Sequence, residues 1–160
     1  MRARPGRRFL LQPAELANYR LMPAFLTDRP IDVAALIADV SAADRGGTVV
    51  FLGTVRNSPE DGDVAGIEYS AYPEMVQAEF DRILAEVRER WPAARVALRH
   101  RTGYVLAGEA SIAVVVACPH RVGAYEASRY IVEATKAGVP VWKKERMATG
   151  EQRWVEAHHA

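Results

Sequence analysis

The stretch Ala110–Cys118, ASIAVVVAC, and the residues 119–138 that follow it, PHRVGAYEASRYIVEATKAG, decide the fold of this chain. The first segment is apolar almost throughout and rich in β-branched residues, which is typical of a buried strand. The second repeats small and apolar residues at helical spacing and reaches Gly138, a residue type that commonly closes a helix. A buried strand that leads into an amphipathic helix predicts helices packed on a sheet.

The flanking sequence extends this pattern in both directions. Apolar and β-branched runs predict further strands over residues 48–55, 64–71 and 95–101, and a last short hairpin over 142–147 and 153–156. Helical spacing of apolar residues predicts helices over residues 32–43 and 73–91. Asp32 is placed to cap the first of these helices, while Pro73 opens the second and Pro92 stops it. This order predicts an α+β domain in which the helices pack on one mixed or antiparallel sheet.

Composition limits what such a domain can do. The chain has 160 residues, 49% of them apolar, which suits one domain with its own core. No apolar run approaches the roughly 18 residues needed to cross a bilayer, and a net charge of +1 gives no global attraction to nucleic acid or membrane. The single cysteine, Cys118, excludes an internal disulfide and is compatible with a reducing cytoplasm, where we expect the protein to lie. The sequence has no zinc-type Cys/His spacing, and we expect no metal and no cofactor.

The ends of the chain differ from its centre. Residues 1–21 carry five arginines against one acid, and the apolar run after Arg7-Arg8 stops at Gln12-Pro13, too early for an export signal. We predict that residues 1–21 form a flexible extension, that residues 22–157 form a single catalytic domain, and that residues 158–160 are a tail.

Cations gather after the buried strand. His120 and Arg121 lie where the central helix begins, and helix N-termini offer unsatisfied N–H groups to anions. Lys136 lies in the last turn of the same helix, and Gly138 and Pro140 allow the chain to turn back and bring Lys143 close to it. Two neighbouring ammonium groups lower each other's pKa, so one of them can serve as an acid, a base or a nucleophile.

Other roles for these residues remain open. His120 and Arg121 also suit a helix cap and a surface arginine, and Lys136 also complements the helix dipole. Arg56, after the strand over 48–55, either adds a third cation or pairs with a nearby acid. Cys118 is a tempting nucleophile beside His120, although a buried thiol is more often part of a core.

The ordered motifs resemble the large, catalytic subunit family of molybdopterin synthase over residues 24–157. The pieces that carry this resemblance are FLGTVRN (51–57), YP (72–73), RWP (90–92), HRTG (100–103), GE (108–109), HR (120–121), AYEA (124–127), Lys136, PVWKKE (140–145) and RWV (153–155). The resemblance implies an α+β fold with a hammerhead-like αβ portion, which we expect together with a small β subdomain.

The family likeness also implies an activity. Such enzymes install the dithiolene of molybdopterin on cyclic pyranopterin monophosphate, in molybdenum cofactor biosynthesis. The sulfur comes from a small ubiquitin-like subunit with a C-terminal Gly-Gly thiocarboxylate, and two large subunits form a central dimer. Since this chain ends in His158-His159-Ala160, it is not the sulfur carrier itself. Pterin phosphate, the small subunit and a second copy are therefore the expected partners, with no nucleic acid and no membrane.

The resemblance assigns roles by position. Lys136 and Lys143 match the catalytic lysines, and the substrate-binding positions are Thr54, Val55, Arg56, His120, Arg121, Lys144 and Glu145. A phosphate and a thiocarboxylate repel one another unless cations offset their charge. At a separation of 4 Å and an effective dielectric near 20, two unit charges interact by about 4 kcal/mol. We therefore expect cations from three separated segments to converge on one cavity, with Lys143 holding the thiocarboxylate and Lys136 moving protons.

Two functions remain as alternatives to sulfur transfer. In the first, Lys136, Lys143 and Lys144 form a non-catalytic patch for an anion or a nucleic acid, with Trp142 as a stacking platform. In the second, Cys118 and His120 act as a cysteine-dependent transferase.

Overall fold

The structure of the chain is a computed structural model, and it describes residues 25–155 except 59 and 61. The helices are α2 (Val33–Val40), α3 (Pro73–Arg90) and α4 (Arg121–Gly138). The strands are β1 (Leu26–Thr27), β2 (Gly47–Thr54), β3 (Val64–Ala71), β4 (Arg95–Arg101), β5 (Gly103–Leu106), β6 (Ala110–Cys118), β7 (Val141–Met147) and β8 (Gln152–Trp154). The predicted extension over 1–21 and the tail over 158–160 lie outside the described residues.

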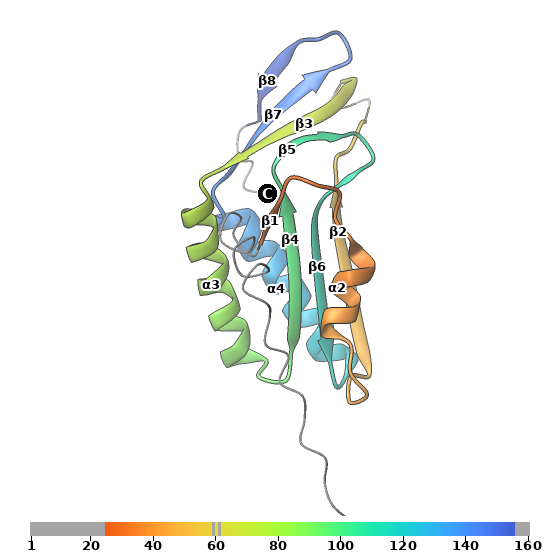
Figure 1. Cartoon of the computed structure of the whole chain (residues 1–160), viewed down its shortest axis with the longest axis vertical. Helices are drawn as coiled ribbons and strands as arrows, with labels where there is room; N and C mark the ends of the chain where they lie inside the picture. The colour runs from red at the N-terminus through yellow and green to blue at the C-terminus, as the bar shows by residue number, and fades with distance from the viewer. Residues whose placement is uncertain (1–24, 59, 61, 156–160) are drawn as a thin grey trace, which may run out of the picture.

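The first sheet, sheet A, has the strand order β1-β4-β6-β2 and is covered by helices on both faces (Figure 1). Helices α3 and α4 pack on one face through a cluster that includes Phe80 and Ile131. Helix α2 packs on the other face through Leu36 and Val40. Strand β6 serves both clusters, because alternate side chains point to opposite faces and residues 113–117 are all fully buried.

The second sheet, sheet C, has the order β5-β3-β7-β8 and lies at the upper end of the molecule in Figure 1. Strand β3 is central and pairs antiparallel with both β5 and β7. A small core of Val55, Tyr69 and Val105 lies under it and links it to the end of β2. Chain connections therefore place the ends of β2, β4 and α4 beside sheet C.

The expected α+β class is confirmed, and sheet C is the small β subdomain. The Asp32 carboxylate accepts the Ala35 N–H at 3.0 Å, which makes it the predicted N-cap, although α2 ends at Val40 and not at residue 43. Strand β1, which pairs parallel with β4, was not predicted because two residues carry no periodicity. The expectation of one sheet is wrong, since the described strands divide into two.

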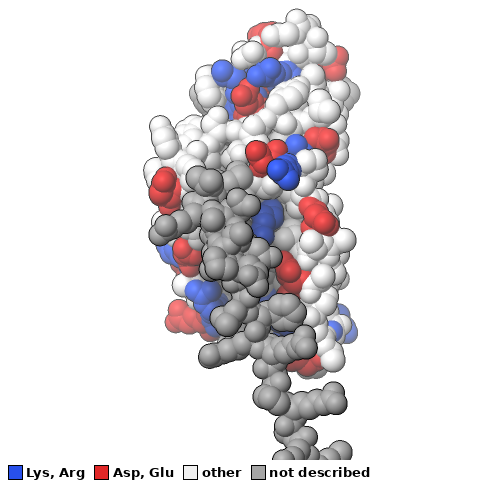
Figure 2. All heavy atoms as spheres, in the orientation of Figure 1, with Lys and Arg blue, Asp and Glu red and all other residues white. Residues whose placement is uncertain are grey.

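No helix among the described residues is both long and apolar enough to cross a bilayer. On the face shown in Figure 2, Lys and Arg side chains are mixed with Asp and Glu. That face therefore presents no broad positive field of the kind that single-stranded nucleic acid binding requires.

Candidate active site

Lys136 and Lys143 come together where α4 ends and β7 begins. The reversal between them is short: the Val139 N–H donates to Thr135 O at 3.1 Å, and the Val141 N–H donates to Val139 O at 2.9 Å. Loss of water around Lys143 lowers the pKa of its ammonium, and the positive charge of Lys136 lowers it further. The Lys143 side chain still reaches solvent, so a substrate can approach it. The predicted pairing of the two lysines is therefore present in the fold.

A buried aromatic pair lies beside Lys143. Tyr69 on β3 is the direct cross-strand neighbour of Lys143, and its ring meets the His100 ring edge-on, with centroids 5.4 Å apart. The His100 Nδ1 lies 2.8 Å from Arg101 O; since a carbonyl only accepts, Nδ1 carries the proton and Nε2 is left as an acceptor.

Both rings are held in their neutral forms. Burial lowers the pKa of His100, the hydrogen bond to Arg101 opposes this, and the charge of Lys143 lowers it again. Burial raises the pKa of Tyr69, although a hydrogen bond to the Ser111 side chain acts in the opposite direction. Lys143 is thus bordered by two neutral polar rings that supply no counter-charge, which is consistent with its lowered pKa.

The end of β2 joins the same region. The Ser111 hydroxyl donates to Gly53 O at 3.1 Å, and Val55 is buried in the small core with Tyr69. Val55 is also fixed by its backbone, because its N–H donates to Glu109 O at 2.9 Å and its carbonyl accepts from the Gly108 N–H at 2.7 Å. Thr54, Val55 and Arg56 therefore lie at the junction of the two sheets, on the side where Tyr69 faces Lys143.

Glu109, which the sequence suggests only as a turn acid, holds this junction together. Its carboxylate accepts a hydrogen bond from the buried Arg101 at 3.0 Å, and Arg101 lowers the pKa of Glu109. This ion pair connects the β5–β6 turn to the end of β4.

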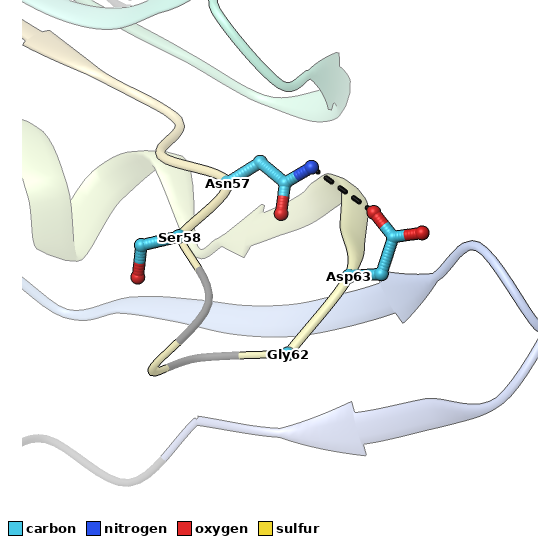
Figure 3. Close-up of a pocket in the computed structure, with 4 residues that line it drawn as sticks. All are labelled: Asn57, Ser58, Gly62 and Asp63. Atoms are coloured by element: carbon cyan, nitrogen blue, oxygen red, sulfur yellow. Dashed lines mark hydrogen bonds between the residues drawn. The ribbon is translucent and has the colours of Figure 1, made fainter.

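The loop after Arg56 folds back on itself (Figure 3). The Asn57 amide donates to Asp63 Oδ1 at 3.0 Å, and its carbonyl oxygen accepts the Val64 N–H at 3.2 Å. Gly62 has φ +83°, a backbone conformation that favours glycine. Asn57, Ser58, Gly62 and Asp63 line a shallow, open pocket of about 350 Å³. Its acidic and amide lining does not suit a phosphate.

Lys144 and Glu145 have different surroundings. Strand alternation points Lys144 to the outer face of sheet C, where its ammonium lies 4.8 Å from the centre of the Trp154 ring. Glu145 lies on the same face as Lys143 and accepts a hydrogen bond from Arg153. Of the two neighbouring lysines, only Lys143 therefore faces Tyr69.

His120 and Arg121 lie at the other end of α4. Fifteen positions separate Arg121 from Lys136, which is about 22 Å along a helix that rises about 1.5 Å per residue. His120 instead borders a pocket of about 310 Å³ whose wall includes Trp91, Cys118 and Gly123. Within one chain, the expectation that these cations converge with the lysines is wrong, because a continuous helix holds them apart.

Cys118 closes β6 and belongs to the main core. It is 4% exposed, and burial raises the pKa of its thiol, an effect that the charge of Arg45 only partly offsets. A raised pKa keeps the thiol protonated and unreactive. The cysteine-dependent transferase is therefore disfavoured.

Sequence reasoning missed Tyr69, His100 and Ser111 as neighbours of Lys143. His100 appears in the HRTG motif, and alternation over 95–101 could have directed it inward. The meeting of His100 with Tyr69 depends on how sheet C lies over the end of sheet A. No local pattern encodes that arrangement.

Comparison with known proteins connects this arrangement to a class of enzymes. The family described as MoaE protein matches residues 26–138. Molybdopterin synthase catalytic subunit 1 of Mycobacterium tuberculosis is 39% identical over 130 residues, covering 81% of this chain and 88% of the relative. The Bacillus subtilis molybdopterin synthase catalytic subunit is 38% identical over 130 residues, covering 81% of this chain and 82% of that protein.

Solved structures of molybdopterin synthase proteins have the same fold as this chain. Molybdopterin synthase from Staphylococcus aureus superposes with a TM-score of 0.79 at 28% identity, covering 86% of this chain and 99% of that one. A complex of subunits 1 and 2 of molybdopterin-converting factor from Helicobacter pylori gives a TM-score of 0.70 at 20% identity, covering 82% of this chain and 89% of that one, which supports the fold alone.

The fold and these matches define a sulfurtransferase of molybdenum cofactor biosynthesis, as predicted. The chain belongs to the MoaE family, among the molybdopterin synthase catalytic subunits.

Proposed function

We propose that this chain transfers sulfur from the C-terminal thiocarboxylate of a small ubiquitin-like subunit to cyclic pyranopterin monophosphate, forming the dithiolene of molybdopterin in the cytoplasm. The observation that carries this proposal is the pairing of Lys136 with a Lys143 of lowered pKa beside Tyr69 and His100. The proposal needs no metal or cofactor.

The lowered pKa favours Lys143 as the residue that gives and takes the proton while sulfur adds and the cyclic phosphate opens. Lys136 is exposed at the C-terminal end of α4 and fits the task of holding the thiocarboxylate, or the tail carbonyl as it becomes tetrahedral. This division reverses the one expected from sequence. Thr54, Val55 and Arg56 border the same junction and are assigned to the substrate, while Glu145 orients β8 through Arg153.

His120 and Arg121 of the same chain do not reach the site at Lys136 and Lys143. Since about 22 Å of helix separates them from Lys136 in one chain, we propose that the homodimer supplies them to the substrate phosphate from the second copy. Lys144, which contacts Trp154 on the outer face, is assigned to the docked small subunit and not to the pterin.

The direct test mixes this chain with a thiocarboxylated small subunit and the pyranopterin, and measures dithiolene formation. A small subunit ending in an ordinary carboxylate is the matched control. Product with the first and none with the second supports the proposal, whereas no product from a small subunit that demonstrably binds overturns it.

A separate experiment tests whether each active site takes residues from two copies of the chain. Two differently tagged chains, one carrying Lys143→Ala and the other Arg121→Ala, are co-expressed and the mixed dimer is purified. If sites are built from two copies, the mixed dimer retains one intact site and about half of the wild-type activity, although each parental variant is inactive. An inactive mixed dimer would show that Arg121 serves its own chain.

A further inference from the structure

Strands β2 and β6 lose their regular register at one point, beside the end of β2 that we assign to the substrate. Gly53 is paired with Ile112. The next residue, Thr54, is paired with Ala110, so Ser111 of β6 is left as the extra residue of a β-bulge. Such bulges bend a strand and redirect the residues beyond them, and they are frequent beside active sites. The direction of β2 from Thr54 onward therefore depends on how this bulge is held.

The Ser111 side chain joins the bulge to sheet C. Its hydroxyl donates to Gly53 O at 3.1 Å and is hydrogen-bonded to the side chain of Tyr69 on β3. A serine hydroxyl has one hydrogen and two lone pairs, so it can donate to Gly53 and accept from Tyr69 at the same time. Ser111 and Tyr69 are 6% and 5% exposed, and in such an interior a hydrogen bond is stronger than in water. One hydroxyl thus connects strands β2, β6 and β3.

The Tyr69 end of this link is fixed beside Lys143. Tyr69 is the direct cross-strand neighbour of Lys143, and its ring lies edge-on against the His100 ring. At the β2 end, Val55 is buried with Tyr69 in one small core, and its backbone is bonded to the β5–β6 turn. The end of β2 therefore has to break these contacts before its distance from Lys143 can change.

We infer that Ser111 and Tyr69 are positioning residues for sulfur transfer, because they hold the substrate-binding end of β2 in place relative to Lys143. The inference rests on the proposed function, which assigns residues 54–56 to the substrate and Lys143 to proton transfer, and it adds the link that aligns the two. Neither hydroxyl needs to touch the substrate. A misplacement of about 1 Å can lower a rate by about 10²-fold, so a buried link of this kind has a large effect on turnover.

Two substitutions break the link in different places. Tyr69→Phe removes the bond between β3 and the bulge and keeps the ring against His100, whereas Ser111→Ala removes both bonds of the serine. With a saturating thiocarboxylated small subunit, we expect kcat/KM for the pyranopterin to fall about 10-fold or more in each variant. The double variant should fall no further than Ser111→Ala, because both changes act through one hydroxyl. Ser128→Ala, which removes a serine hydroxyl of similar burial from α4, is the matched control and should stay close to wild type.

The pH–rate profile separates positioning from a change in the surroundings of Lys143. Tyr69→Phe and Ser111→Ala place no charge beside the Lys143 ammonium, so the limb that reports Lys143 should keep its position while kcat/KM falls. Circular dichroism at the assay temperature should show both variants folded. A limb that moves in either variant, or kcat/KM values equal to that of Ser128→Ala, overturns the inference.

Amide hydrogen exchange tests the link without activity. The Val55 N–H donates to Glu109 O at 2.9 Å, and the amide of the fully buried Ile131 in α4 is the reference for opening of the whole domain. In Tyr69→Phe and Ser111→Ala, exchange at Val55 should accelerate more than exchange at Ile131. Equal acceleration at both amides overturns the inference. If the wild type forms no dithiolene, the proposed function is overturned, whereas selective acceleration at Val55 would still show that the two hydroxyls hold the end of β2.

Discussion

The two ends of helix α4 carry the same kind of charge in opposite settings. At its C-terminal end, Lys136 lies near Lys143, and the surroundings remove enough water to lower the pKa of Lys143. At its N-terminal end, His120 and Arg121 are exposed, next to a pocket walled by Trp91 and Cys118. The first setting lowers the pKa of an ammonium, which we propose for proton transfer, and the second leaves exposed side chains that we propose for a phosphate. One continuous helix thus carries both sets of proposed site residues and keeps them apart.

The largest effect is expected at the C-terminal end. Lys143→Ala should lower turnover by about 10³-fold, because proton transfer by a positioned side chain contributes roughly 10²–10⁴-fold. Lys143→Arg should not rescue it, since guanidinium does not release its proton. Lys144→Ala is the comparison: because Lys144 is assigned to the docked small subunit, it should weaken small-subunit binding, while the single-turnover rate at a saturating small subunit stays within a few-fold of wild type. Equal losses at both positions would remove the distinction between the two faces of β7.

A second substitution tests whether the two lysines are coupled. Lys136→Gln removes the positive charge that helps to lower the pKa of Lys143, so the Lys143 pKa should rise. The limb of the pH–rate profile that reports Lys143 should then move to higher pH, with turnover lowered by about 10²-fold. A profile that keeps its position while its height falls would mean that Lys136 only anchors the tail.

The N-terminal end of α4 can be perturbed without changing the surroundings of Lys143 at its C-terminal end. A Cβ on Gly47 would press on the backbone of Arg121, so Gly47→Ala must shift the start of α4. We expect activity to fall several-fold and stability to fall by about 1–3 kcal/mol, the usual range for overpacking. The Lys143 limb of the pH profile should stay in place. Thr48→Ala, at the exposed neighbour, is the control; a shifted limb in Gly47→Ala would mean that the two ends communicate.

The smallest effect is a change in the pH dependence of stability. Burial lowers the His100 pKa in the folded state, so the unfolded chain binds more protons below its ordinary value of 6.5. Stability should therefore fall as the pH falls below about 6.5, by at most about 1.4 kcal/mol per pH unit for this one group. Denaturant titrations of His100→Gln should show a shallower slope between pH 7 and 5. An identical slope would mean that His100 is not held neutral.

The elements were largely predictable because their signals are local. The β-branched run of β6, the helical spacing in α3 and α4, and the cap at Asp32 each lie within a few residues. The nearness of Lys136 and Lys143 was predictable for the same reason, because only a short turn separates them. That Arg121 would lie a full helix away from them was also implied by the length of α4, but the expectation of one cavity overlooked it.

The remaining features depend on long-range packing. Tyr69, His100 and Ser111 come from three strands that meet only when sheet C closes over the end of sheet A. The position of β2 at an edge of sheet A follows from strand order, which single-sequence periodicity does not specify. The surroundings of Lys143 are therefore not encoded in any one segment.

The full enclosure of β6 has a consequence for how this protein moves. Residues 113–117 have strands on both sides and helices above and below, so their amides are sealed from solvent on every side. Such amides exchange deuterium only when the whole domain opens, whereas the ends of α4 can fray at much lower free energy. The ends of α4, which carry the proposed site residues, can therefore open locally while β6 stays folded.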